Sequence, residues 1–214
     1  MSVVGIADMH MPYSNFTLSK VKADFRLTTV ETEVLFPQVV PLSPSKLLTL
    51  NLEENLSLAT AINTEKARSE LIIMPVLTDV KRQLKGQVSL FSGVDFNVDA
   101  ARGLNGTCDF ILTRSSEQFF VTQPVVTIVE AKRENIPSVL GQCIATMLAA
   151  QQFNLQEGET VGSIYGAVTT GTDWKFLKLH NQVAYIDRSD YFISETDKIL
   201  GILIATCQVA SHND

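Results

Sequence analysis

A stretch from about residue 58 to residue 85 carries apolar residues at helical spacing. Two rows repeat at intervals of three and four residues, one through Ile73, Leu77, Val80 and Leu84 and the other through Ile72 and Val76. This pattern predicts a long, partly buried helix. Pro75 lies inside it and has no backbone donor, so we expect a kink or a segment boundary there.

The next stretch alternates apolar and polar residues, which is typical of strands with one buried face. V-D-F-N-V-D at 94–99 and T-C-D-F-I-L-T at 107–113 share this alternation, and the turn RGLNG joins them. Together they predict a β-hairpin. The apolar run PVVTIVEAK at 124–132 predicts a further strand.

Helices and short strands are mixed in the rest of the chain. VLGQCIATMLAAQQF has the helical period, and Gly141, Ala145 and Ala149 form a row of small residues that would let this helix approach a sheet closely. Residues 165–187 predict three short strands around the turns TTGTD and HNQ. Residues 195–208 predict a closing helix.

This order of elements predicts an α/β fold, a mixed β-sheet flanked by helices with strand 124–132 at its centre. Residues 1–55 are less regular, because short β-type runs such as FRLTTVETEVLF alternate with proline-containing breaks. We expect residues 1–55 to be an N-terminal elaboration packed on the domain that residues 56–214 form. An alternative role for residues 1–55 is that of an arm in a homodimer.

The charge of the chain is unevenly distributed. Its 214 residues carry a net charge of −6, which argues against a protein that coats nucleic acid by bulk electrostatics. Residues 63–135, however, hold nine basic and nine acidic side chains, so the deficit lies elsewhere. Cations bound by acids of this central stretch would make it electropositive, and a phosphate substrate is therefore compatible with the acidic composition.

Cysteine usage and hydropathy indicate a cytoplasmic protein. Cys108, Cys143 and Cys207 are widely separated and lie in apolar stretches, so we expect buried thiols in a reducing compartment. No apolar run approaches the roughly 20 residues of a membrane-spanning helix. The N-terminal residues also lack the basic and apolar regions of a signal peptide.

Three charged residues at strand ends carry the candidate chemistry. Asp109 lies at the start of the strand 107–113, and Glu130 and Lys132 end the next strand on the same face. If these strands pair antiparallel, two carboxylates and an ammonium meet at one edge of the sheet. Carboxylates bind hard divalent cations such as Mg²⁺ or Mn²⁺, and a lysine beside them can orient or deprotonate an attacking water.

The preceding helix offers a further acidic side chain. Glu65 shares the face of Ile72 and Val76, and Glu70 lies near the row of Ile73. Because of these positions on the helix, either side chain can reach the site. Each can instead be a solvated charge on the helix surface. We therefore expect one of them, Glu65 or Glu70, to contribute to the site.

In five short segments the sequence resembles the PD-(D/E)XK nuclease superfamily, which has the restriction-endonuclease-like fold. The matching words lie between residue 63 and about residue 180: TEKARSELIIMPVL, GLNGTCDFIL, IVEAKRE, GQCIATMLAAQ and YGAVTTGTDWKFLKL. They are similar to nuclease domains of type I restriction motor subunits and to small stand-alone cyanobacterial relatives. The resemblance implies that Asp109 and Glu130 bind the metal, Lys132 acts at the water and Gln142 supports the site. It also implies that Glu65 or Glu70 adds an outer metal ligand.

The sequence thus predicts a nuclease that hydrolyses phosphodiester bonds with Mg²⁺ or Mn²⁺, with DNA rather than RNA as its expected partner. The alternative is a module that binds nucleic acid or assists assembly and keeps the fold without catalysis. Nucleic-acid binding that is indifferent to divalent ions and to Asp109→Asn would support this alternative.

Overall fold

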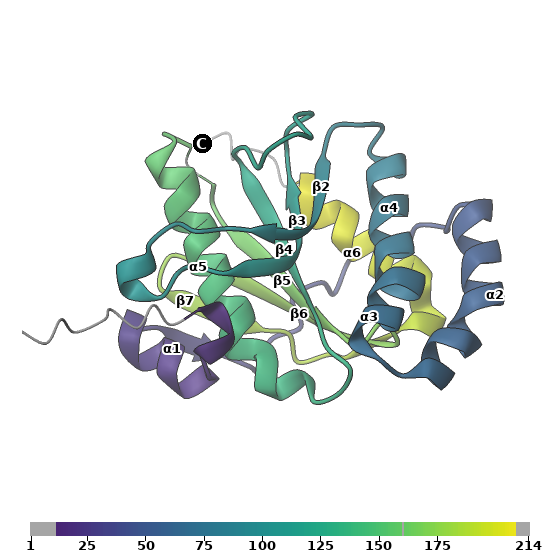
Figure 1. Ribbon diagram of the computed structural model, residues 1–214, viewed down its shortest axis with the longest axis horizontal. Coiled ribbons are helices and arrows are strands. Elements are labelled where there is room, and N and C mark those ends of the chain that lie inside the picture. Colours follow the sequence, from purple (N-terminus) through teal and green to yellow (C-terminus); the bar gives the residue numbers. More distant parts are fainter. Residues whose placement is uncertain (1–11, 160, 209–214) are drawn as a thin grey trace, which may run out of the picture.

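The computed structural model describes residues 12–159 and 161–208. Eight strands of these residues form one mixed sheet in the order β1-β7-β6-β5-β4-β3-β2, with β8 paired to β6 (Figure 1). The pairs β1/β7 and β4/β5 are parallel and the others are antiparallel. The strands are β1 (Thr28–Val30), β2 (Ser89–Asp95), β3 (Thr107–Thr113), β4 (Val125–Ala131), β5 (Ile164–Thr169), β6 (Asp173–His180), β7 (Val183–Ile186) and β8 (Tyr191–Phe192).

Helices cover both faces of the sheet, which confirms the predicted α/β architecture (Figure 1). One hydrophobic core contains residues of α1 and α5, and a second core on the opposite side contains residues of α2, α4 and α6. All seven residues of β4 are buried between these cores. The helices are α1 (Leu18–Phe25), α2 (Lys46–Ile62), α3 (Glu65–Arg68), α4 (Met74–Gln83), α5 (Leu140–Gln156) and α6 (Thr196–Gln208).

The predicted hairpin and the later elements are present with shifted ends. β2 and β3 pair antiparallel, but β2 runs over Ser89–Asp95 instead of 94–99. β5, β6 and β7 are the three strands expected between residues 165 and 187. β8 is a short additional strand that periodicity could not show, because it has only two residues.

The single helix predicted over residues 58–85 is wrong, because the chain breaks at Asn63. Asn63 has a φ of 51°, which ends α2, and the Thr64 side chain then caps α3 by accepting a hydrogen bond from the Ala67 amide. A π-helical turn over Ser69–Ile73 leads directly into α4. Pro75 lies in the first turn of α4, so the segment boundary expected at this proline is confirmed.

Within residues 12–55, the longest regular elements are α1 and the first part of α2, which corrects the prediction of short β-type runs. Only Thr28–Val30 forms a strand there, whereas α1 and α2 begin at the capping residues Thr17 and Ser45. Buried Asp79 of α4 accepts hydrogen bonds from both the amide and the hydroxyl of Ser45, so a distant contact fixes the start of α2. The expected boundary between residues 55 and 56 falls inside α2.

Glycines mediate two close approaches of α5, one of which differs from the prediction. Gly141 faces the N-terminal segment instead of the sheet, because a Cβ on it would lie 2.2 Å from the carbonyl carbon of Thr17. The close contact between helix and sheet depends on Gly166 of β5. A Cβ there would lie 2.5 Å from the Met147 sulfur and 2.9 Å from the Cys143 sulfur.

The three cysteines are free and buried, as the sequence predicts. Burial raises the pKa of Cys207 to about 11, so this thiol stays protonated at neutral pH. Across residues 12–159 and 161–208, no helix has both the length and the apolar character needed to cross a membrane.

Candidate active site

The antiparallel pairing of β3 with β4 brings the two predicted carboxylates together. Phe110 lies opposite Val129, and continuing this register by one residue places Asp109 beside Glu130. The amide of Ala131 donates a hydrogen bond of 2.8 Å to Asp109 Oδ2. The carboxyl groups of Asp109 and Glu130 interact with each other directly. The juxtaposition therefore follows from backbone pairing and from the adjacent amide.

Helix α5 holds Glu130 from the other side. Glu130 has no solvent-exposed surface. Gln142 Nε2 donates to its Oε2 at 2.7 Å, and the Thr146 hydroxyl donates to its Oε1 at 3.2 Å. Gln142 and Thr146 are four residues apart and thus share one face of the helix. Both oxygens of Glu130 consequently have a fixed direction.

The electrostatics of the carboxyl pair favour its protonated form. Burial, followed by the negative charge of Asp109, raises the pKa of Glu130 well above its usual value. Burial also raises the pKa of Asp109, while the Ala131 amide opposes this rise and the charge of Glu65 adds to it. Two acids that resist ionisation at close range form a site that a positive charge would stabilise.

Lys132 continues the chain from this pair and meets Glu65. Its amide donates to the Thr169 carbonyl at 2.8 Å, which extends the pairing of β4 with β5. Its Nζ lies 3.4 Å from Glu65 Oε2, and the two side chains are 33% and 45% exposed. Glu70 instead lies 3.8 Å from Lys66 with its side chain 63% exposed. Of the two candidate glutamates, the structure therefore brings Glu65 to the site and leaves Glu70 outside.

Several contributing residues were not predicted from the sequence. Thr146 could have been found, because it lies one helical turn after Gln142. Arg68 of α3 donates to the Thr170 carbonyl at 2.8 Å and so ties the Glu65 helix to the turn after β5. Tyr13 donates a hydrogen bond of 2.5 Å to the Phe96 carbonyl and interacts electrostatically with Glu130. Neither Arg68 nor Tyr13 belongs to a periodic pattern that would have indicated these contacts.

The site offers two carboxylates as ligands for a divalent cation, Asp109 and Glu130. In the part of the chain that the structure describes, no three His, Cys, Asp or Glu side chains are placed to hold a metal ion together. Glu65, expected as a third ligand, forms an ion pair with Lys132 instead. Mg²⁺ usually binds proteins through one or two carboxylates and completes its shell with water and substrate phosphate. Asp109 and Glu130 fit this mode of binding.

Comparisons with known proteins do not extend this picture. Neither models of protein families nor curated proteins match the sequence. The chemistry of Asp109, Glu130, Lys132 and the residues around them is therefore what indicates a function.

Proposed function

We propose that the protein hydrolyses phosphodiester bonds of nucleic acid in a metal-dependent, endonuclease-like reaction, with DNA as its substrate. The observation that carries this proposal is the pairing of Asp109 with Glu130 on neighbouring strands, followed by Lys132. The raised pKa of each carboxyl group supports a site that binds positive charge. The cytoplasm suits this function, and three free buried thiols are compatible with that location.

The residues of the chain divide the work between binding and proton handling. Asp109 and Glu130 would hold a divalent cation, and Gln142 and Thr146 keep the Glu130 oxygens in place. Such a cation would neutralise charge on the scissile phosphate and lower the pKa of an attacking water. The Lys132 ammonium orients the water and stabilises negative charge that develops on the phosphate oxygens. Glu65 limits where the ammonium can swing, because it pairs with it.

The first test measures metal binding and does not depend on the choice of nucleic acid. Mn²⁺ is titrated calorimetrically into the wild type, into Asp109→Asn and into the control Asp190→Asn, which changes an exposed carboxylate outside the site. We expect binding in the wild type and in Asp190→Asn, and its loss in Asp109→Asn. Equal binding by all three proteins would remove Asp109 from the site.

A cleavage assay then tests the role of Lys132. Single-stranded and double-stranded DNA and RNA are incubated with Mg²⁺ or Mn²⁺, and Lys132→Ala is compared with Lys178→Ala on strand β6. Lys132→Ala should fold normally and lose cleavage by roughly 10²-fold or more, because a charge at the reacting phosphate is removed. Unchanged cleavage would overturn the assignment of Lys132.

The burial of Glu130 favours a second candidate, a nucleic-acid-binding module that retains the fold without catalysis. Both oxygens of Glu130 already accept hydrogen bonds from α5, as in a purely structural carboxyl group. Such a module would bind DNA equally in EDTA and in Mg²⁺, and Asp109→Asn would bind as the wild type does. The metal titration and the binding assay together separate the two functions.

A further inference from the structure

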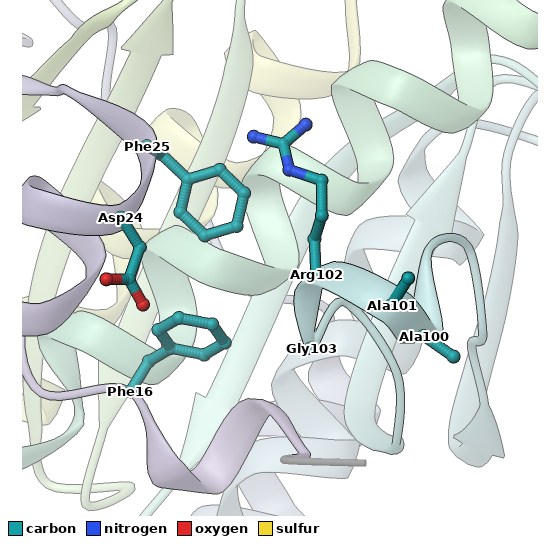
Figure 2. A pocket seen from close by; sticks show the side chains of 7 residues that line it. All are labelled: Phe16, Asp24, Phe25, Ala100, Ala101, Arg102 and Gly103. Atoms are coloured by element: carbon teal, nitrogen blue, oxygen red, sulfur yellow. The ribbon is translucent and has the colours of Figure 1, made fainter. Parts of the chain in front are cut away.

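A pocket of about 350 Å³ lies between α1 and the turn that joins β2 to β3 (Figure 2). Phe16, Phe25 and Asp24 line it from the N-terminal segment. Residues Ala100–Arg102 and Gly103 line it from the turn. This volume lies in the range of pockets that take small organic ligands, roughly 300–1,000 Å³.

Aromatic rings and cations are combined in this pocket, which we call the α1 pocket. The rings of Phe16 and Phe25 lie 5.7 Å apart and are tilted by 54°. The guanidinium carbon of Arg102 stands 4.5 Å from the centre of the Phe25 ring, and Figure 2 shows the two groups facing each other. Lys20 Nζ lies 5.5 Å from the centre of the Phe16 ring. A cation therefore accompanies each ring.

The single carboxylate of the pocket is already neutralised. Asp24 Oδ2 lies 2.6 Å from Lys20 Nζ, one helical turn earlier on α1. The charged residues that line the pocket, Asp24 and Arg102, have opposite charges, and Lys20 adds a positive charge beside Asp24. The guanidinium of Arg102 is planar and carries N–H donors on its edge, so it can bind a phosphate while its face stacks on an aromatic group. Aromatic rings and arginine planes are also the surfaces on which nucleobases stack.

The residues that line the α1 pocket are connected to two elements of the candidate active site, α5 and β3. The Phe16–Thr17 backbone is packed against Gly141, and the next residue, Gln142, donates to Glu130. Gly103 lies six residues before Asp109 in the chain, so extended backbone separates them by at most about 20 Å. This length equals about six base steps of a nucleic-acid strand at 3.4 Å each.

We propose that the α1 pocket binds a nucleotide, with the base on the outer face of the Arg102 guanidinium and with the phosphate at the edge of that guanidinium. The Phe16 and Phe25 rings, which are only 3% and 8% exposed, support Arg102 from below. This inference builds on the proposed function, in which the nucleotide belongs to the substrate strand within about six base steps of the scissile bond. A free mononucleotide has the same chemistry. The pocket would then position the strand relative to Asp109 and Glu130.

Two variants test the pocket from different directions. Arg102→Gln removes the charge and the stacking plane from an exposed turn, and Ala101→Phe fills the pocket from another exposed position of the same turn. Arg188→Gln, which changes an exposed arginine after β7, is the control. Fluorescence anisotropy in EDTA measures binding of a labelled oligonucleotide of about a dozen nucleotides. Calorimetry measures binding of a purine mononucleotide to the same proteins.

We expect both pocket variants to weaken oligonucleotide binding by roughly ten-fold, the loss that removal of one stacking contact causes, while Arg188→Gln binds normally. A mononucleotide that binds as tightly as the oligonucleotide and depends on Arg102 would support the pocket with a free nucleotide as its ligand. Oligonucleotide binding that is equal in all proteins would overturn the α1 pocket and leave the nuclease proposal intact, since metal binding and cleavage are measured separately. Absence of all oligonucleotide and mononucleotide binding would likewise overturn the α1 pocket, and the metal titration and the cleavage assay would still decide the nuclease proposal.

Discussion

Replacing Glu130 by glutamine tests whether the fold gives up stability to keep an acid in its interior. Burial and the neighbouring charge of Asp109 raise the pKa of Glu130 well above the usual 4.5. Folding therefore favours the protonated form. The contribution of protonated Glu130 to the stability of the fold is complete below the pKa of the unfolded state, and it is lost as the pH rises through the pKa of the folded state. Each pKa unit between the two states costs about 1.4 kcal/mol at higher pH.

Glutamine keeps the shape of the side chain and removes this penalty. Gln142 and Thr146 donate to the two carboxylate oxygens at 2.7 and 3.2 Å, and the Gln142 amide can rotate to present its oxygen to the new amide nitrogen. We therefore expect Glu130→Gln to raise the free energy of unfolding at neutral pH in EDTA, by about 1.4 kcal/mol for each pKa unit by which folding raises the pKa of Glu130. For a domain of this size, each kcal/mol raises Tm by roughly 2–4 °C.

Urea and thermal unfolding measure this gain, and its pH dependence identifies the cause. The difference between Glu130→Gln and the wild type should disappear when the pH falls below the unfolded value of 4.5. The control Glu134→Gln changes a glutamate with a side chain 62% exposed and should shift stability by at most about 0.5 kcal/mol. Mn²⁺ should stabilise the wild type and leave Glu130→Gln unaffected. A variant that is less stable than the wild type at neutral pH would refute the reasoning.

Three further predictions concern the supports of the fold and the site. Asp79→Ala should lower the free energy of unfolding by about 2–4 kcal/mol in urea titration, because the buried carboxylate accepts hydrogen bonds from Ser45, the capping residue of α2, and binds Arg82. Although burial opposes it, hydrogen bonding lowers the pKa of Asp79. The contribution of Asp79 to stability should therefore be present above pH 3.8 and lost as the pH falls through the folded pKa. Acid unfolding of the wild type and of Asp79→Ala checks this. Gly141→Ala should destabilise by about 2 kcal/mol or more, since its Cβ would lie 2.2 Å from the Thr17 backbone, and an unchanged Tm would contradict this packing. Thr146→Val should weaken Mn²⁺ affinity without abolishing binding, because it removes one of two hydrogen bonds that orient Glu130, and calorimetry measures the difference.

The elements that the sequence predicts best are those whose pattern is local. The hairpin of β2 and β3 and the strand β4 follow from alternation and from an apolar run, and their pairing is fixed once the faces are known. The meeting of Asp109 with Glu130 depends on this register alone. The sequence therefore indicates the central part of the candidate site without any knowledge of the helices.

Positions set by distant contacts were predicted poorly. The break at Asn63 interrupts an apolar period that continues on both sides, so periodicity joined two helices into one. The start of α2 depends on Asp79, which lies 34 residues after the capping Ser45. Gly141, the first residue of the predicted row of small residues, packs against the N-terminal segment instead of the sheet, because spacing within one helix cannot identify a partner.

The N-terminal segment also affects the geometry of the site through contacts between residues that are far apart in the sequence. Gln142 and Thr146 reach Glu130 only if α5 lies at the right depth on the sheet, and the Thr17 backbone limits that depth through Gly141. Tyr13, four residues before Thr17, is bonded through its hydroxyl to Phe96 in the turn that leads to Asp109. The residues outside the PD-(D/E)XK resemblance thus contact both supports of the carboxylate pair. The pair is set by strand register, whereas the direction of its oxygens depends on how the N-terminal segment packs.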